Sequence, residues 1–431
     1  MTTETTAPAP QSGAAEDVHP GNRVPVSSLV SNLRDYGLIL ALIAIMVFFQ
    51  VTTGGTMFKP LNLSNLVQQN SFIIVMALGM LLVIVSGHID LSVGSVAGFI
   101  GALSAMMMVI WPLGILSDPL VVSLVCLVIG ALIGGAQGYW IAYHKIPSFI
   151  VTLAGMLTFR GLCQALLGGG SSVGPLPDSF KALSSGFIPD LIGPLVLIPP
   201  TINAAGKTIV GSGLTLHMTT IVIGIIAVLV YVVFALRARR TRERHGYAAE
   251  PFGLFVVKAL VIAALSLYLV VQFAAYKGIP IVLLVMSLLI GLFVFVTKMT
   301  TIGRRVYAMG GNAKAAQLSG IKIERLTLLV FVNMGVLSAL GGLIIAARQG
   351  QAVPAAGTGS ELDVIAAVFI GGASAMGGVG QVISTVVGGF IMGVMNNGMS
   401  IMGVNIDWQQ VVKGFVLLGA VIFDVYNKNK G

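Results

Sequence analysis

Residues 300–325, TTIGRRVYAMGGNAKAAQLSGIKIER, form a basic segment of small residues between two long apolar runs. Connections between neighbouring helices usually need only about 2–8 residues, so this one is unusually long. Its basic side chains outnumber the acidic ones, with Arg304, Arg305, Lys314, Lys322 and Arg325 against Glu324 alone. An excess of Lys and Arg is typical of cytoplasmic loops in membrane proteins. The segment, taken as residues 299–325, therefore predicts a membrane protein with a large cytoplasmic loop here.

The centre of this segment, residues 312–319, is rich in alanine and predicts a short amphipathic helix lying across the loop. Such a helix would serve as a docking site for a soluble partner. The alternative is a long loop whose charges only fix the topology. The residues by themselves leave both interpretations open.

The composition of the whole chain identifies an integral membrane protein. It is 56% hydrophobic and 9% charged, with a mean hydropathy of +0.97, whereas soluble domains carry about 25% charged residues. The formal charge of +9 does not indicate nucleic-acid binding, because the basic residues gather in a few loops. The small-residue ridges Gly130-xxx-Gly134-xxx-Gly138 and Gly389-xxx-Gly393 predict close helix contacts. Cys126 and Cys163 lie in apolar runs and are expected to be buried thiols.

A spanning helix needs about 20 mostly apolar residues, and this rule predicts an all-α polytopic protein with about twelve transmembrane helices. Two places suggest a broken or re-entrant helix. The spans 70–87 and 91–111 are separated by only three residues, and the span 361–379 is rich in glycine. The expected spans are 36–53, 70–87, 91–111, 120–142, 147–167, 218–237, 254–275, 279–298, 326–346, 361–379, 381–401 and 409–426.

An even number of spans places both termini on one side, and the distribution of Lys and Arg assigns that side to the cytoplasm. Residues 1–35 lack the basic start and short apolar core of a signal peptide, so they are expected to be a disordered cytoplasmic tail. The expected transmembrane domain covers residues 36–426. It is followed by a short cytoplasmic tail, 427–431, and interrupted by an external loop, 168–217.

The sequence offers no catalytic, cofactor or metal constellation. The five histidines are scattered and none pairs with another at ligand spacing. Ion-coupled carriers normally hold charged residues deep in their helices, and few occur here. Arg160 is expected to pair with backbone carbonyls, and Glu361 and Asp363 are expected to cap the outer end of the tenth span.

Asp90 stands out in GHIDLSVGS, residues 87–95, at the junction of two apolar segments. Its carboxylate is expected to cap a helix beginning at Leu91, beside Ser92. The glycines Gly87 and Gly94 permit close approach of the backbone. The alternative is direct participation in gating or substrate passage.

Neutral polar side chains inside the spans suit the passage of a neutral solute such as a sugar. Gln164, Asn396 and Asn397 have this character, and Gln349 and Gln351 lie at an expected outer mouth. Residues of this kind more often form hydrogen bonds between helices than line a substrate path.

Five segments in the same order resemble one family, the permease subunits of bacterial ABC importers for ribose, xylose and related monosaccharides. They are GHIDLSVGS (87–95), IPSFIVTLAGMLTFRG (146–161), IGRRVYAMGGNAKAAQLSG (302–320), ELDVIAAVFIGGASAMGGVG (361–380) and NNG (396–398). The Arg-rich loop 237–246 and the span after it look like an insertion relative to shorter members. In this respect the chain resembles the long xylose or multiple-sugar permeases, which implies a pentose or hexose as substrate.

The resemblance implies a multi-pass subunit of the bacterial inner membrane with no enzymatic activity or cofactor of its own. Its expected partners are a cytoplasmic ATPase subunit, a periplasmic sugar-binding protein, a second permease copy and the lipid bilayer, with no nucleic acid. The coupling region would be Arg304, Gly310, Gly311, Asn312, Ala316 and Gly320. The main alternative is an ion-coupled secondary sugar carrier, and a membrane-embedded transferase is a more remote one.

Overall fold

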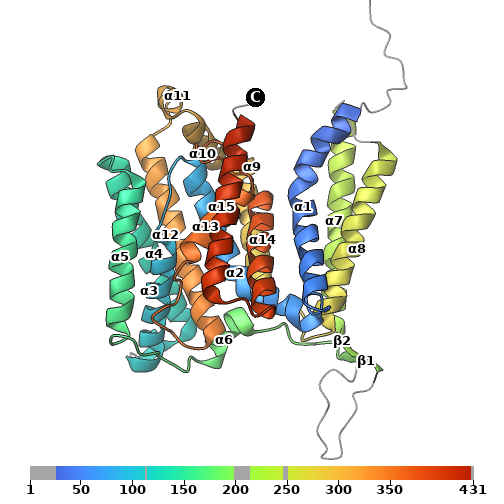
Figure 1. Cartoon of the computed structure of the whole chain (residues 1–431), viewed down its shortest axis with the longest axis horizontal. Helices are drawn as coiled ribbons and strands as arrows, with labels where there is room; N and C mark the ends of the chain where they lie inside the picture. The colour runs from blue at the N-terminus through green and yellow to red at the C-terminus, as the bar shows by residue number, and fades with distance from the viewer. Residues whose placement is uncertain (1–25, 112–113, 199–213, 246–250, 429–431) are drawn as a thin grey trace, which may run out of the picture.

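The computed structural model describes residues 26–111, 114–198, 214–245 and 251–428, which form a bundle of roughly parallel helices (Figure 1). The long helices are α1 (Val26–Thr52), α2 (Pro60–Val85), α4 (Pro119–Tyr143), α5 (Ser148–Leu166), α7 (Met218–Arg244), α8 (Phe252–Ala274), α9 (Ile281–Met299), α12 (Ile323–Gln349), α14 (Val382–Ile401) and α15 (Ile406–Lys428). The shorter ones are α3 (Val93–Ala105), α6 (Asp178–Ser185), α10 (Thr301–Gly311), α11 (Ala313–Leu318) and α13 (Ser360–Ile370).

Within these described residues, nine helices are long and apolar enough to cross a membrane. They confirm the all-α polytopic fold. The expected span 361–379 is not one continuous helix, as its glycines suggested, because α13 has only 11 residues and is about 17 Å long against a hydrocarbon core of about 30 Å. It ends at Gly371 and Gly372, and the φ of +80° at Gly372 turns the chain out of the helix.

The two spans around Asp90 also differ from the expectation. The first begins ten residues earlier, at Pro60. The second begins at Val93 and runs to Ile110, with a π-helical last turn, Met106–Ile110. Residues 86–92 run between them as a non-helical connection, visible in Figure 1 between one end of α2 and the start of α3. The suspected break therefore lies in the connection and not within either helix.

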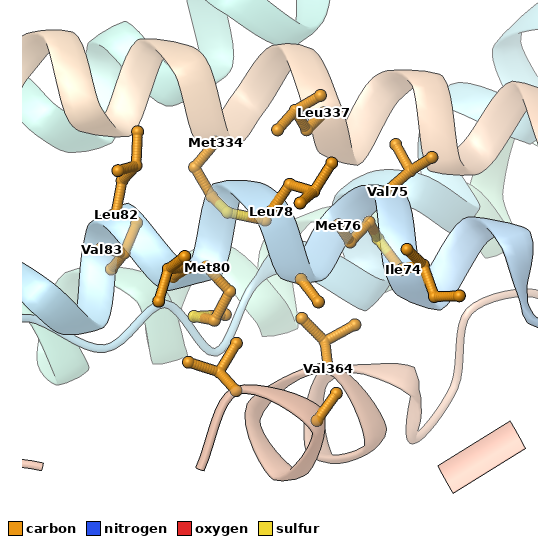
Figure 2. Packing of buried hydrophobic residues seen from close by; sticks show 14 of the residues in the cluster. Ile74, Val75, Met76, Leu78, Met80, Leu82, Val83, Met334, Leu337 and Val364 are labelled. Atoms are coloured by element: carbon orange, nitrogen blue, oxygen red, sulfur yellow. The ribbon is translucent and has the colours of Figure 1, made fainter. Parts of the chain in front are cut away.

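The centre of the fold is α2, whose side chains are almost all buried between α12, α13 and α14. Figure 2 shows Met76, Leu78 and Met80 of α2 between Met334 and Leu337 of α12 and Val364 of α13. Because lipid is as apolar as these side chains, close packing and not the hydrophobic effect holds such helices together.

The glycine ridges make the helix contacts that the sequence predicts. A Cβ atom at Gly134 of α4 would overlap the carbonyl oxygen of Phe331 in α12, and one at Gly335 would overlap the carbonyl of Gly130. Gly389 and Gly393 of α14 lie in the same way against Ile74 and Asn70 of α2. Cys126 and Cys163 are buried free thiols, as expected.

The expected external loop, 168–217, contains regular structure that the sequence analysis missed. It includes α6 and the antiparallel pair β1 (Pro194–Ile198) and β2 (Leu214–His217), with Leu195 opposite Leu216. Phe180 of α6 is buried, and Val173 exchanges backbone hydrogen bonds of 2.9 and 3.0 Å with Ala352. The segment is thus fastened to the bundle, because its apolar side chains and its backbone find partners there.

The expected tails are shorter where the structure describes them. Residues 26–35 belong to α1 and not to a disordered tail, and residues 427–428 continue α15. The remaining residues of both predicted tails, 1–25 and 429–431, lie outside the described residues.

Candidate functional site

The basic segment 300–325 folds as two helices, α10 and α11. Thr300 begins α10 by accepting a hydrogen bond from the Gly303 N–H (3.3 Å), and Asn312 begins α11 by accepting one from the Ala315 N–H (3.0 Å). The segment closes at Gly320, whose φ of +83° lets the Ile321 N–H reach the Ala316 carbonyl at 3.1 Å. This is a Schellman-type helix end. The sequence predicted α11 but not α10.

Gly310 joins this segment to the core of the bundle. A Cβ at Gly310 would overlap the carbonyl oxygen of Val85 and lie 2.7 Å from the Gly378 nitrogen. The same Val85 carbonyl accepts the Gly378 N–H at 2.8 Å, and Tyr307 donates to the Gly380 carbonyl at 2.8 Å. The end of α2 and the turn that follows α13 therefore meet at Gly310.

The other side of the segment is exposed and projects from the bundle, where Figure 1 shows α11 at the tip. Leu318 is 90% exposed, whereas Ala316 is buried and faces inward. Gly311 has no atom within 4 Å of a Cβ position. The basic residues around this apolar tip are all exposed: Arg304, Arg305, Lys314, Lys322 and Arg325.

The turn of Gly87, Asp90, Ser92 and Gly94 is a compact hydrogen-bonded unit. The buried Asp90 carboxylate accepts from the Ser92 N–H (2.8 Å) and hydroxyl (2.7 Å), and Ser92 in turn pairs with Gln137 of α4 at 3.0 Å. Gly87 has a φ of +84°. The helix starts at Val93 and not at Leu91, so Asp90 binds the residue that precedes the helix.

Gly94 lies against the segment that leads into α13. A Cβ there would overlap a carboxylate oxygen of Glu361 and the Gly357 carbonyl. Glu361 and Asp363 were expected at the outer end of a span. In the structure both side chains are buried in the first turn of the half-helix α13, so they lie inside the bundle. Arg160 donates to the hydroxyls of Thr358 (2.9 Å) and Ser95 (3.2 Å), and not to backbone carbonyls as expected.

A polar cavity of about 280 Å³ lies between α2, the C-terminal end of α12 and the start of α13. Arg348 crosses it and donates to the Gln68 side chain at 2.6 Å. Its neutral and charged lining groups include Gln68, Gln69, Arg348, Gln349, Thr358 and Asp363. The expected outer-mouth residue Gln349 is among them.

Asn396 and Asn397 touch residues of this cavity from α14. Asn396 donates to Asp363 at 3.2 Å, and Asn397 donates to Gln69 at 3.4 Å. Asp363 also forms an ion pair of 3.0 Å with Lys413 of α15. Gln164 is not part of this group, because it lies exposed on α5, at another edge of the bundle (Figure 1).

Sequence reasoning missed Gln68, Gln69 and Arg348 as members of this cavity. The expected span began at residue 70, which left the polar start of α2 outside the membrane. The signal was the run Asn65, Gln68, Gln69, Asn70 at the head of a long apolar helix.

In the segment 168–217, Asp190 fixes the start of α7. It accepts from the N–H groups of Met218 and Thr219 (both 3.2 Å) and from the Thr219 hydroxyl (2.8 Å). Burial raises the pKa of Asp190, but these hydrogen bonds outweigh it and hold the pKa below its usual value. Among the described residues, no group of three or more His, Cys, Asp or Glu side chains is placed to hold a metal ion.

A sequence profile for permeases, described as "Branched-chain amino acid transport system / permease component", matches residues 62–243 and 213–421. The chain belongs to this permease family. The two matches overlap on α7, which contains most of the Arg-rich segment 237–246 that the sequence marked as the start of an insertion. Members of this family are transport components and not enzymes, and this one is a multi-pass protein of the inner membrane.

The chain is similar to named sugar permeases over most of its length. It is 38% identical to the xylose transport system permease protein XylH of Haemophilus influenzae, over 93% of this chain and 98% of that protein. It is 38% identical to XylH of Escherichia coli, over 93% of each chain. It is 30% identical to the ribose import permease protein RbsC of Escherichia coli, over 89% of this chain and 92% of that one. No solved structure matches the chain.

Proposed function

We propose that this chain is the membrane subunit of an ATP-driven importer that moves a monosaccharide, xylose or another pentose or hexose, into the cytoplasm by alternating access. The similarity to XylH supports the sugar class. The polar cavity supports it further, because its amide and hydroxyl groups match the hydroxyls of a neutral sugar. Substrate sites in other transporters often lie where a discontinuous helix begins, as α13 does here.

The observation that carries the mechanism is the contact at Gly310. Gly310 touches the end of α2 and the turn that follows α13. The opposite ends of α2 and α13 line the cavity, through Gln68 and Asp363. A partner that displaces α10 and α11 would therefore shift two cavity walls at once. A ligand can only drive such a change if it binds the two states differently, and an ATPase that closes on ATP meets this condition.

The docking surface for the ATPase subunit is the exposed side of α10 and α11. Leu318 would enter an apolar pocket of the partner, and Arg304, Lys314 and their basic neighbours would pair with acidic groups around it. Gly311, Asn312 and Gly320 would preserve the shape of this surface. In this arrangement the segment and both termini are cytoplasmic, and the face with α6 and β1 receives the periplasmic sugar-binding protein.

A second permease copy would complete the path. Most side chains of α5 are exposed in the single chain, and they include the polar Gln164, which is unfavourable against lipid. The exposed face of α5 would therefore meet the second copy and place Gln164 near the shared axis. For the turn at Asp90 we propose a structural role in holding the start of α3 against α4, since its Oδ1 accepts both hydrogen bonds from Ser92, which in turn pairs with Gln137 of α4.

Uptake into proteoliposomes tests the proposal. They would contain the purified chain, with and without its candidate ATPase and binding protein, and labelled xylose, ribose and leucine. Uptake of a sugar that requires both partners and ATP is the expected result. Uptake by the chain alone under an ion gradient would favour the secondary-carrier alternative, and uptake of leucine alone would favour the amino-acid substrates that the family description names.

Leu318→Asp tests the docking surface, with Leu191→Asp as its matched control. Both leucines are highly exposed, at 90% and 81%, but Leu318 belongs to α11 and Leu191 precedes β1, which lies at the opposite end of the bundle (Figure 1). The first variant should lose co-purification of the ATPase and ATP-dependent uptake while it stays folded. The second should keep the ATPase bound. Normal ATPase binding by Leu318→Asp would refute the assignment of this surface.

A further inference from the structure

The hairpin of α7 and α8 gathers positive charge at one end. Residues 237–258 contain six basic and two acidic side chains, a net charge of +4. Figure 1 shows this end of the hairpin remote from β1 and β2. The apolar stretches of both helices end here, so in a membrane this end would lie at the level of the lipid head groups.

At this end, a cavity of about 230 Å³ lies between the facing sides of the two helices. On α7 the lining residues Tyr231, Ala235, Ala238 and Arg242 recur at helical spacing and so share one face. On α8 the cavity is closed by Phe255 and Lys258.

Arg239 is held rigidly at the rim of this cavity. Its guanidinium lies 5.3 and 5.2 Å from the ring centres of Phe252 and Phe255, and its Nε is 2.8 Å from Glu243. Its side chain is only 15% exposed. Stacking on aromatic rings orients an arginine side chain before any ligand binds, so the side chain loses less conformational entropy when a ligand does bind. Arg242, one turn further along, is exposed beside the same cavity.

We propose that this cavity binds the phosphate head group of an anionic phospholipid, between Arg242 and Lys258. Basic pockets between membrane helices are suited to such head groups. Toward the membrane interior, the same two helices expose large apolar side chains, among them Phe234 (65%) and Leu260 (63%). These surfaces continue from the cavity along the direction in which the acyl chains would lie.

The lipid, and not a soluble phosphate, is the occupant because of where the cavity opens. It lies within a hairpin whose apolar faces are almost wholly exposed, with none of the most apolar stretch of α8 buried in the chain. In the membrane these faces are covered by lipid. This inference does not depend on which solute the permease moves.

The test compares lipid binding by the intact, delipidated chain using native mass spectrometry. The probes are dioleoyl phosphatidylglycerol and dioleoyl phosphatidylcholine, which share their acyl chains, and inorganic phosphate as a competitor. The variants are Arg242→Gln/Lys258→Gln and the matched control Arg240→Gln/Arg244→Gln. Both remove two positive charges from the same end of the hairpin, but only the first pair lines the cavity.

We expect the cavity variant to bind phosphatidylglycerol on the order of tenfold more weakly than the unmodified chain. The control should change by less than about twofold. Arg242→Gln alone, on an exposed turn, should show an intermediate loss and guards against misfolding of the double variant. Equal losses in both double variants would mean a diffuse surface charge and no site. Tight binding of phosphatidylcholine, or displacement of the lipid by millimolar inorganic phosphate, would also overturn the proposal.

Discussion

Gly310 and Gly311 are adjacent glycines with opposite surroundings, which makes them a sharp test of the coupling geometry. A Cβ at Gly310 would overlap the Val85 carbonyl and crowd the Gly378 nitrogen, whereas one at Gly311 would meet no atom within 4 Å. We therefore predict that Gly310→Ala destabilises the protein and that Gly311→Ala does not.

The magnitude follows from the contacts that must give way. Relieving an overlap with backbone costs about 1–3 kcal/mol. Separating the Gly378 N–H from the Val85 carbonyl (2.8 Å) leaves two buried groups unpaired, at about 1–3 kcal/mol. Both substitutions gain about 0.5–1 kcal/mol because alanine favours a helix over glycine. Gly310→Ala should thus lower the free energy of unfolding by about 1–5 kcal/mol, whereas Gly311→Ala should leave it unchanged or raise it slightly.

The assay is thermal stability of the detergent-purified chain, followed by the fraction that elutes as a single species after heating. Gly310→Ala should melt several degrees below the unmodified chain, and Gly311→Ala at or slightly above it. ATP-dependent uptake, measured below both melting temperatures, should fall for Gly310→Ala because α10 can no longer seat against α2. Identical melting curves for the two variants would refute the close contact at Gly310, and with it the route from the docking surface to the cavity.

Two further predictions concern the polar groups inside the bundle. Lys413→Met should lower the free energy of unfolding by about 3 kcal/mol, because it leaves the Asp363 carboxylate, whose side chain is 11% exposed, without its ion-pair partner. Adding Asp363→Asn should restore most of the melting temperature. No recovery in the double variant would contradict a role for the pair in stability. Asp90→Asn should change the free energy of unfolding by less than about 1 kcal/mol, because an asparagine oxygen can still accept the hydrogen bond from the Ser92 N–H (2.8 Å). If the Asp90→Asn protein folds but is inactive in the uptake assay, the charge itself takes part in transport.

The membrane fold could be predicted from composition and periodicity alone. Each spanning helix must form all its backbone hydrogen bonds within itself, so it appears in the sequence as a continuous run of apolar residues long enough to cross the membrane. The glycine ridges of α4 and α14 were readable for a similar local reason, since only small residues allow backbones to touch. The alanine-rich run 312–319 predicted α11, because helix propensity also depends only on local residues.

The partners of polar residues were decided only by the tertiary structure. Arg348 meets Gln68 across 280 positions of sequence, and Asn397 meets Gln69 across 328, so no local pattern could pair them. The glycines of 361–379 suggested a broken span, but the sequence did not show where the helix stops, because its glycine-rich continuation is apolar and hydropathy does not distinguish a helix from a turn packed against Gly310 and Val85. Apolar content fixes which segments enter the membrane, whereas contacts between distant segments fix where each one stops and which groups line the path between them.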